Sequence, residues 1–383
     1  MRKPRVLVLH RQQSAVGYYR QWVPARALAR AGWEVTWSEE RPWFRRPQLE
    51  EWIRDQAARH EVVLVDREVK PERLGLLVGL RHLMNDGRMV VDLDDDIMNI
   101  PPWNLGRGDY HPGQAAWNAT MWHLMWAELA TVTTSTLAER FRCRAHGIRV
   151  VPNVLDPADW EGHPVNPERA ADPAFRIFYG GASGHYGDLD VVRPALEAFL
   201  LDPPAPVRLV CFGTVPKWLH DLRRRYPHRV VVCRWVPFRD YPAAVAWGGF
   251  DLSLAPLAEH PFNEAKSAIK ALEAGIQGIP FLATPVGPYR DLPRDAFHVI
   301  PPEGWLDFLR EAVRSRDLLA RAAKRAREFV LDVGTVARVA SLWEDVIEDV
   351  RSRPRIDSVE AAEALPDVGS TGTDGPGEPD ARP

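Results

Sequence analysis

The stretch HPFNEAKSAIKALEAGIQGIPFLATPVG, residues 260–287, predicts a helix followed by a short buried strand. Asn263 is a favoured N-cap residue and Gly275 is of a type that commonly ends helices, so we expect the helix to cover residues 264–274. The apolar run 280–284 has the length and continuity of a strand covered on both faces. A helix that leads into such a strand is typical of a parallel α/β sheet.

The same alternation of apolar runs and helical patterns extends along most of the chain. The runs are continuous, which is typical of parallel strands covered by helices on both faces. A length of 383 residues favours two domains, because single cores stop growing near ~250–300 residues. We therefore predict an α/β fold of two doubly wound, Rossmann-like domains that face each other across a cleft. The predicted strands lie at 5–10, 34–39, 61–66, 88–93, 130–135 and 149–157, and then at 175–181, 207–213, 229–236, 250–257 and 280–284.

Composition divides the chain into five segments. Residues rich in proline and polar groups separate the two halves, as expected of an interdomain linker. A strong helical pattern follows the second half, and the residues after it are mostly Pro, Gly, Asp, Glu, Ser and Thr, which predicts disorder. The segments are an N-terminal domain (1–156), a linker (157–173), a C-terminal domain (174–334), a closing helix (335–353) and a disordered tail (354–383).

Charge and composition argue against several classes of protein. A net charge of −3 and a pI near 6.5 carry no signature of nucleic-acid binding. The three cysteines are far apart and two lie in apolar runs, so we expect buried thiols and a cytoplasmic location. The first apolar run is too short for a signal peptide, and no run approaches the ~18 apolar residues of a membrane span. The segment RPWFRRP, 41–47, could make a peripheral membrane contact.

Two lysines stand out in the opening stretch, because only six of the 49 basic residues are lysine. Asn263, Lys266, Lys270 and Glu273 share one face of the predicted helix. A cation in a first helical turn opposes the helix dipole by ~0.3–1 kcal/mol, but a phosphate bound there would make the same charge favourable. Ser267 lies between the lysines, and Glu273 could accept hydrogen bonds from ribose hydroxyls. The alternative is a solvated polar face with a Lys270–Glu273 pair.

A glycine-rich loop, FYGGASGHYGDLD at 178–190, follows the first strand of the second half. Gly180 and Gly181 would let the backbone approach a ligand closely, and Ser183 and His185 are possible hydrogen-bond donors to it. An ordinary strand-to-helix turn would have a similar composition, and a lone histidine is often structural.

The acidic run DLDDD, 92–96, is expected at the end of a strand, facing the cleft. Three interpretations remain open: a metal site, a carboxylate that binds or activates an acceptor, and residues that cap a turn or helix. Under the second interpretation, Asp94 or Asp95 orients an acceptor hydroxyl. Asp94, Asp95 and His185 are the candidate catalytic residues.

These motifs together resemble the group 1 (family-four-type) glycosyltransferases of GT-B architecture. The closest similarity is to a bacterial and phage branch with an N-x-x-K-S-x-x-K-x-x-E pattern. The resemblance covers roughly residues 5–345, and its other matching segments are VGYYR (16–20), VVDLDDDI (90–97), VTTSTLAERF (132–141) and VPNVLD (151–156).

The resemblance implies a transferase that binds a nucleotide-activated sugar on the second domain and an acceptor on the first. The family mostly retains the anomeric configuration, and Mg²⁺ is not required for its chemistry, so no cofactor and no metal ligand are expected. Gly17 would lie near the donor phosphates. Glu273 matches the second member of the family's Glu-x7-Glu pair, but Ala265 stands at the first, and Glu264 is one place away. The basic pair of the glycine-rich loop is also absent, so the two lysines would take over the diphosphate.

We therefore expect a glycosyltransferase, of hexosyltransferase type, that uses a nucleotide diphosphate-sugar as co-substrate. Its acceptor would be a glycan, a lipid-linked glycan, a protein or another small molecule. Two alternatives are a catalytically silent glycosyltransferase-like binding subunit and a nucleotide-sugar epimerase of the same fold. An epimerase needs no second substrate, and a silent subunit would bind nucleotide without consuming a donor.

Overall fold

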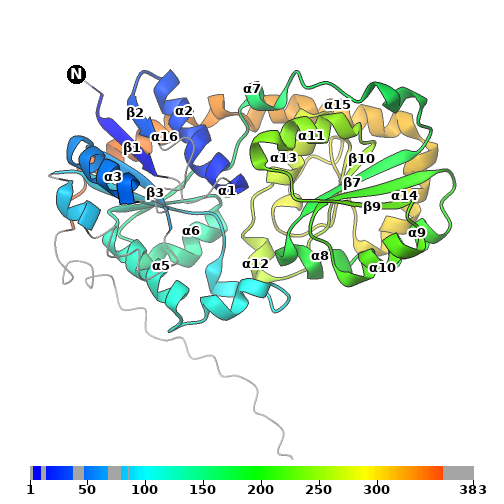
Figure 1. Ribbon diagram of the computed structural model, residues 1–383, viewed down its shortest axis with the longest axis horizontal. Coiled ribbons are helices and arrows are strands. Elements are labelled where there is room, and N and C mark those ends of the chain that lie inside the picture. The colour runs from blue at the N-terminus through cyan, green and yellow to red at the C-terminus, as the bar shows by residue number, and fades with distance from the viewer. Residues whose placement is uncertain (1–2, 10–13, 38–46, 68–78, 85, 357–383) are drawn as a thin grey trace, which may run out of the picture.

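The structure consists of two α/β domains that lie side by side and are joined along one edge (Figure 1). The computed structural model describes residues 3–9, 14–37, 47–67, 79–84 and 86–356. Residues 41–46 of the predicted membrane-contact segment and residues 357–383 of the predicted tail lie outside the described residues. Within the described part of the chain, no helix is both long and apolar enough to cross a membrane.

The first domain is a parallel sheet of six strands in the order β2-β1-β3-β4-β5-β6. Its strands are β1 (Arg5–Leu9), β2 (Glu34–Trp37), β3 (Val62–Asp66), β4 (Arg88–Leu93), β5 (Leu129–Val132) and β6 (Ile148–Val150). Its helices include α1 (Ala15–Gly17), α2 (Val23–Arg30), α3 (Pro47–Arg59), α5 (Ala115–Trp126) and α6 (Ser135–Phe141). A π-helical turn, η1 (Tyr18–Trp22), joins α1 to α2.

The second domain is a parallel sheet of six strands in the order β12-β11-β10-β7-β8-β9. Its strands are β7 (Phe175–Gly181), β8 (Val207–Gly213), β9 (Val230–Cys233), β10 (Leu252–Ala255), β11 (Phe281–Ala283) and β12 (His298–Val299). Its helices are α8 (Tyr186–Asp190), α9 (Arg193–Leu201), α10 (Lys217–Arg225), α11 (Tyr241–Gly248), α12 (Pro261–Glu264), α13 (Ile269–Ile276), α14 (Trp305–Arg314) and α15 (Arg316–Val333). The prediction of two doubly wound domains is thus confirmed.

Some predicted strands are shorter than expected, for local reasons. The expected strand 130–135 ends at Val132, because the hydroxyl of Thr134 caps α6 by accepting from the Leu137 N–H at 3.2 Å. The expected strand 149–157 ends at Val150, and Pro152 soon follows, a residue that cannot donate to a strand ladder. The two-residue strand β12 is too short to be recognised as an apolar run.

The order of the strands in each sheet determines which loops lie at the ligand-binding edge. In the first sheet the order reverses between β1 and β3, and in the second it reverses between β7 and β10. Ligands of open α/β sheets bind at the carboxyl ends of the strands, at such reversal points. The loops that follow β1, β7 and β10 are therefore in the ligand-binding position of each sheet.

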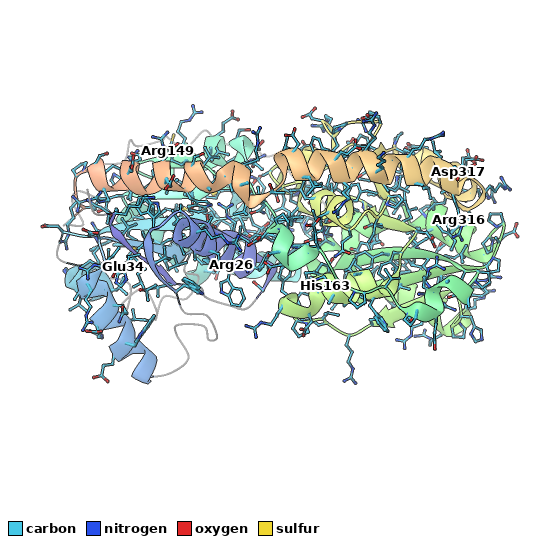
Figure 2. The ribbon with its side chains drawn as sticks, turned by 90° about the horizontal axis from the view of Figure 1, so that it is seen from above. Arg26, Glu34, Arg149, His163, Arg316 and Asp317 are labelled. Carbon is cyan, nitrogen blue, oxygen red and sulfur yellow. The ribbon has the colours of Figure 1, made fainter. Side chains whose placement is uncertain are left out.

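The two domains are joined twice along the same edge. The linker contains two short helical turns, α7 (Pro157–Trp160) and η5 (Pro167–Ala171), and Trp160 is buried. The chain then returns through α16 (Val336–Ser352), which packs on the first domain and buries Trp343. Figure 2 shows α15 and α16 along one side, with Arg149 beside α16, where it pairs with Asp349 at 2.6 Å.

Candidate active site

A cleft of about 390 Å³ lies between the domains and is lined by residues of both. It is bounded by the segments after β1 and β4, the ends of β7 and β8, and the segment from 257 to 273. Most of the predicted site residues line it, namely Asp94, Asp95, Gly180, Gly181, His185, Lys266, Ser267, Lys270 and Glu273. Among the described residues, Gly17, Ser183 and Asn263 are not part of this lining.

The predicted helix over 264–274 is wrong, because the chain forms two short helices there. His260 caps α12, with its Nδ1 accepting from the Phe262 N–H at 3.2 Å. Residues 265–268 then separate α12 from α13, whose N-cap position is Ala268. Lys266 and Ser267 thus lie in the connecting turn, and Lys270 is in the first turn of α13.

Asn263 is not the cap that the sequence predicted. Its side chain is buried, and its amide nitrogen donates to Asp188 Oδ1 at 2.6 Å and to the Ala258 carbonyl at 2.9 Å. The residue therefore ties α12 to the glycine-rich segment, and its amide nitrogen is engaged within the protein. An asparagine in an N-cap pattern carries no local sign of such a distant partner.

The two lysines meet in the cleft. Lys266 Nζ lies 4.5 Å from the ring centre of Phe262 and 3.9 Å from Asp95 Oδ1 of the first domain. Lys270 Nζ lies 5.5 Å from the ring centre of Tyr179. Burial, and then the neighbouring charge of Lys266, lowers the pKa of Lys270 to about 8. The two ammonium groups therefore repel each other, and an anion between them would relieve that repulsion.

Glu273 lies at the base of the same cleft, between two tyrosines. The hydroxyl of Tyr19, from the first domain, donates to its Oε1 at 2.6 Å, and that of Tyr241 donates to Oε2 at 3.4 Å. Burial raises the pKa of Glu273 to about 7, against the opposing effect of the Tyr19 hydrogen bond and Lys270. The carboxyl group is thus a hydrogen-bond acceptor held in a fixed orientation.

Glu264 does not occupy the place of the missing first glutamate, which in this chain is Ala265. Ala265 is buried, and its carbonyl accepts from the hydroxyl of Thr134 at 2.9 Å across the domain interface. The side chain of Glu264 is instead held by Arg290 through two hydrogen bonds of 2.9 and 3.0 Å. Glu264 does not line the cleft among the described residues.

The glycines of the segment 180–187 have two different roles. At the cleft, a Cβ at Gly213 would lie 2.2 Å from the Gly181 carbonyl oxygen, so the strand ends approach each other closely. Further on, a Cβ at Gly187 would lie 2.4 Å from the ring of Trp103 in the first domain. The later glycines therefore serve contact between the domains, and only Gly180 and Gly181 line the cleft.

The aspartates of the acidic run 92–96 have different surroundings. Asp92 is buried in an ion pair with Arg20 at 2.7 Å, and Asp96 caps a short turn by accepting from the Met98 N–H at 3.1 Å. Asp94 pairs with Arg67 at 3.2 Å, yet burial and Asp95 raise the pKa of Asp94 to about 7.

The side chain of Asp95 is 37% exposed and lines the cleft. Within the described residues, no group of three or more His, Cys, Asp or Glu side chains is arranged to hold a metal ion.

Several cleft residues were not singled out by the sequence. Arg20 donates to Asn153 Oδ1 at 3.1 Å, and Asn153 donates in turn to the Ser267 hydroxyl at 2.9 Å, which links both domains. Tyr19 and Arg20 lie in the π-helical turn η1, a geometry that often marks functional sites. Their motifs, VGYYR and VPNVLD, were visible, but their partners were not.

Comparison with known proteins gives matches in structure alone. No family model and no curated protein matches the chain. Sucrose-phosphate synthase from Thermosynechococcus elongatus aligns with a TM-score of 0.62 at 15% identity, covering 91% of this chain and 99% of that one. HepE from Anabaena aligns with a TM-score of 0.61 at 14% identity, covering 90% and 100% of the two chains. The catalytic domain of starch synthase IV from Arabidopsis thaliana aligns with a TM-score of 0.61 at 11% identity, covering 92% and 100%.

The chain has the GT-B fold. This confirms the predicted architecture of two Rossmann-like domains facing each other across a cleft. In the GT-B frame, Lys266, Lys270 and Glu273 belong to the second domain, and Asp94 and Asp95 face them from the first.

Proposed function

We propose that the chain is a glycosyltransferase that moves a sugar from a nucleoside diphosphate-sugar to an acceptor. The observation that carries this proposal is the convergence of Lys266, Lys270 and Glu273 in the cleft beside the strand-order reversal of the second sheet. Among the GT-B neighbours, the HepE structure contains UDP and glucose, and the starch synthase IV structure contains ADP and acarbose. These ligands belong to the chemical class that the cleft residues suit.

The second domain would hold the donor. Lys266, Lys270 and the first turn of α13 would neutralise the diphosphate, and Glu273 would accept hydrogen bonds from the ribose hydroxyls. The leaving group of the transfer is the nucleoside diphosphate, whose negative charge grows as the sugar departs. Cations fixed beside that charge stabilise the transition state more than the ground state.

The first domain would hold the acceptor. Asp95 is the more exposed carboxylate of the cleft and lies on the opposite wall from the lysines. It would orient the acceptor hydroxyl, with Asp94 beside it as a group that can share or take the proton. We further propose transfer of a hexose with retention of configuration. The acceptor is a glycan, a lipid-linked glycan, a protein or another small molecule.

The two ammonium groups suggest that the diphosphate is neutralised without Mg²⁺ and that the nucleotide sugar is the only co-substrate. Turnover should then persist in EDTA. We also propose that the protein works in the cytoplasm, because its three cysteines are free thiols, which persist in a reducing compartment.

Nucleotide binding tests the donor site first. UDP, GDP, ADP, CDP and dTDP are added in turn to wild type, Lys270→Ala and Lys324→Ala, and thermal unfolding is followed. A ligand at 100 times its dissociation constant stabilises the native state by ~2.7 kcal/mol. We expect one nucleotide to stabilise wild type and Lys324→Ala, whose lysine is exposed on α15, but not Lys270→Ala. Equal stabilisation of all three proteins would contradict the proposal that Lys270 binds the nucleotide.

A silent nucleotide-binding subunit is the second candidate, because Ala265 replaces the first glutamate and Glu264 is held by Arg290. Such a subunit would bind nucleotide sugar without consuming it in the presence of any acceptor mixture. An epimerase of the same fold would convert the donor with no acceptor present. Product analysis by mass spectrometry and NMR therefore separates all three activities, and NMR of the anomeric proton tests retention.

A further inference from the structure

His185 is held by a buried carboxylate on the side away from the cleft. Its ring lines the cleft, and its Nδ1 lies 2.7 Å from Asp188 Oδ2. Asp188 is fully buried, and its other oxygen accepts from the Ala258 N–H at 2.9 Å and from the Asn263 amide at 2.6 Å. The ring nitrogen left for the cleft is therefore Nε2.

The hydrogen-bond partners determine where the proton of His185 lies. Both groups on Asp188 Oδ1 can only donate, so Asp188 is an acceptor on that side. Burial alone would raise the pKa of Asp188, but hydrogen bonds from His185 and Ala258 lower it below its usual value. Burial and the two lysines lower the pKa of His185 to about 4, so the ring is neutral at pH 7. Its single proton then lies on Nδ1, facing the carboxylate.

A neutral ring in this tautomer presents an acceptor to the cleft. Because His185 neighbours Lys266 and Lys270, the ligand group that reaches Nε2 is either the terminal phosphate of a nucleoside diphosphate or the sugar attached to it. A lone pair repels a phosphate oxygen and accepts from a sugar hydroxyl.

We propose that Asp188 is a positioning residue that fixes the His185 tautomer, so that Nε2 accepts a hydrogen bond from a hydroxyl of the donor sugar. His185 then favours the intact nucleotide sugar over the free nucleoside diphosphate and determines specificity for the sugar. The assignment of the ligand rests on the proposed function, whereas the assignment of the tautomer does not. The sequence suggested His185 as a donor to the ligand, whereas under this proposal its Nε2 accepts.

The tautomer can be measured without any nucleotide. Nitrogen-15 NMR of the imidazole rings distinguishes a protonated Nδ1 from a protonated Nε2, and His185→Gln assigns the signal among the 12 histidines. We expect the free wild-type protein at pH 7 to carry its proton on Nδ1. A wild-type signal from the Nε2–H tautomer, or from a doubly protonated ring, would overturn the proposal, and this readout is taken on the wild-type protein itself.

The variant Asp188→Asn should invert the tautomer with little change of shape. Its amide oxygen must still accept from Ala258 and Asn263, so its NH₂ group faces His185 and donates to Nδ1. The ring proton then moves to Nε2. Asp190→Asn is the matched control, because Asp190 lies on the same helix and accepts from the Trp218 indole N–H at 2.8 Å. The same His185 tautomer in wild type and Asp188→Asn would contradict the positioning role.

Affinity measurements then test the ligand. UDP, GDP, ADP, CDP and dTDP and their glucose conjugates are titrated by calorimetry, and the ratio of the affinities for conjugate and free diphosphate is compared between proteins. A ring that donates from Nε2 should favour the free diphosphate, so we expect the preference for the sugar conjugate to fall on the order of tenfold in Asp188→Asn and to stay unchanged in Asp190→Asn. An unchanged ratio in Asp188→Asn would overturn the sugar contact. If none of these ligands binds wild type, the donor proposal fails, while the NMR result on the tautomer stands.

Discussion

Glu273 combines a candidate ligand-binding role with a cost to stability. Burial raises the pKa of this carboxyl from 4.5 to about 7 in the folded protein. Below about pH 4.5 the group is protonated in both states, and as pH rises through 7 the folded protein must ionise a buried carboxyl. The stability that the protonated group contributes is therefore lost between these two pH values.

Replacing Glu273 by Gln removes this titration and keeps an acceptor for Tyr19. We expect Glu273→Gln to unfold at a higher temperature than wild type at pH 8, by at least the ~2–4 °C that 1 kcal/mol produces in a domain of 150–250 residues. At pH 4.5 the difference should shrink. Differential scanning calorimetry at both pH values measures it, and a difference independent of pH would show that the carboxyl is not held at a raised pKa.

Lys270 gives nucleotide binding its own pH dependence. In the free protein its pKa is lowered to about 8, so above that pH the ammonium group loses its proton and binding a diphosphate must restore it. We expect nucleotide affinity to fall about tenfold for each pH unit above 8, and to be level between pH 7 and 8. Lys270→Gln should bind more weakly and lack this slope. The same slope in wild type and variant would assign the titration to another group.

Some of these residues could be predicted from the sequence. Lys266 and Lys270 are conspicuous because lysine is rare in this chain, and Glu273 follows them at helical spacing. The carboxylate that orients His185 could have been suspected from its spacing of three residues. Tyr19 could not be placed beside Glu273, because that contact spans 254 residues and depends on how two domains meet.

At the scale of elements, the segment 260–276 shows why local pattern is insufficient. Its composition favours one continuous helix, and a cap at Asn263 agrees with every local rule. The chain instead breaks at 265–268, and the Asn263 amide is buried against Asp188, where it donates to the carboxylate oxygen that also accepts from the Ala258 N–H. Tertiary hydrogen bonding here outweighs helix propensity.

One substitution separates the buried role of Asn263 from the predicted cap. An N-cap accepts Asp as readily as Asn, so a capping role predicts little loss of stability in Asn263→Asp. The structure predicts instead a large loss, in the range of ~3–5 kcal/mol, because a second carboxylate would meet Asp188 in a buried site. Asn166→Asp is the control, since Asn166 does cap a turn, accepting from the Glu168 N–H at 2.9 Å. Urea unfolding measures both, and equal effects would restore the capping interpretation.

At the scale of the whole molecule, the two sheets were predictable from repeated apolar runs, but the way they face each other was not. The helix α16 was visible as a helical pattern, yet nothing local indicates that it returns to the first domain. There Glu344 accepts from the indole N–H of Trp33 at 2.6 Å. Contacts between distant segments decide the width of the cleft, and periodicity within a segment carries no information about them.

The hydrogen bond from Tyr19 to Glu273 is one of the contacts that join the two domains at the cleft. It also engages the carboxylate that the proposed function assigns to the ribose hydroxyls. Tyr19→Phe keeps the ring contact with Phe238, whose centre lies 5.2 Å away, and removes only the hydroxyl. Because one hydrogen bond contributes ~0.5–1.5 kcal/mol, we expect nucleoside diphosphate affinity to rise about two- to tenfold and the radius of gyration of the free protein to increase.

Tyr241→Phe is the control. It removes a hydroxyl from the same carboxylate within one domain, so it should leave the radius of gyration unchanged. Small-angle scattering and calorimetry together test this: weaker binding at an unchanged radius in Tyr19→Phe would mean that Tyr19 binds the nucleotide itself and does not hold the domains together.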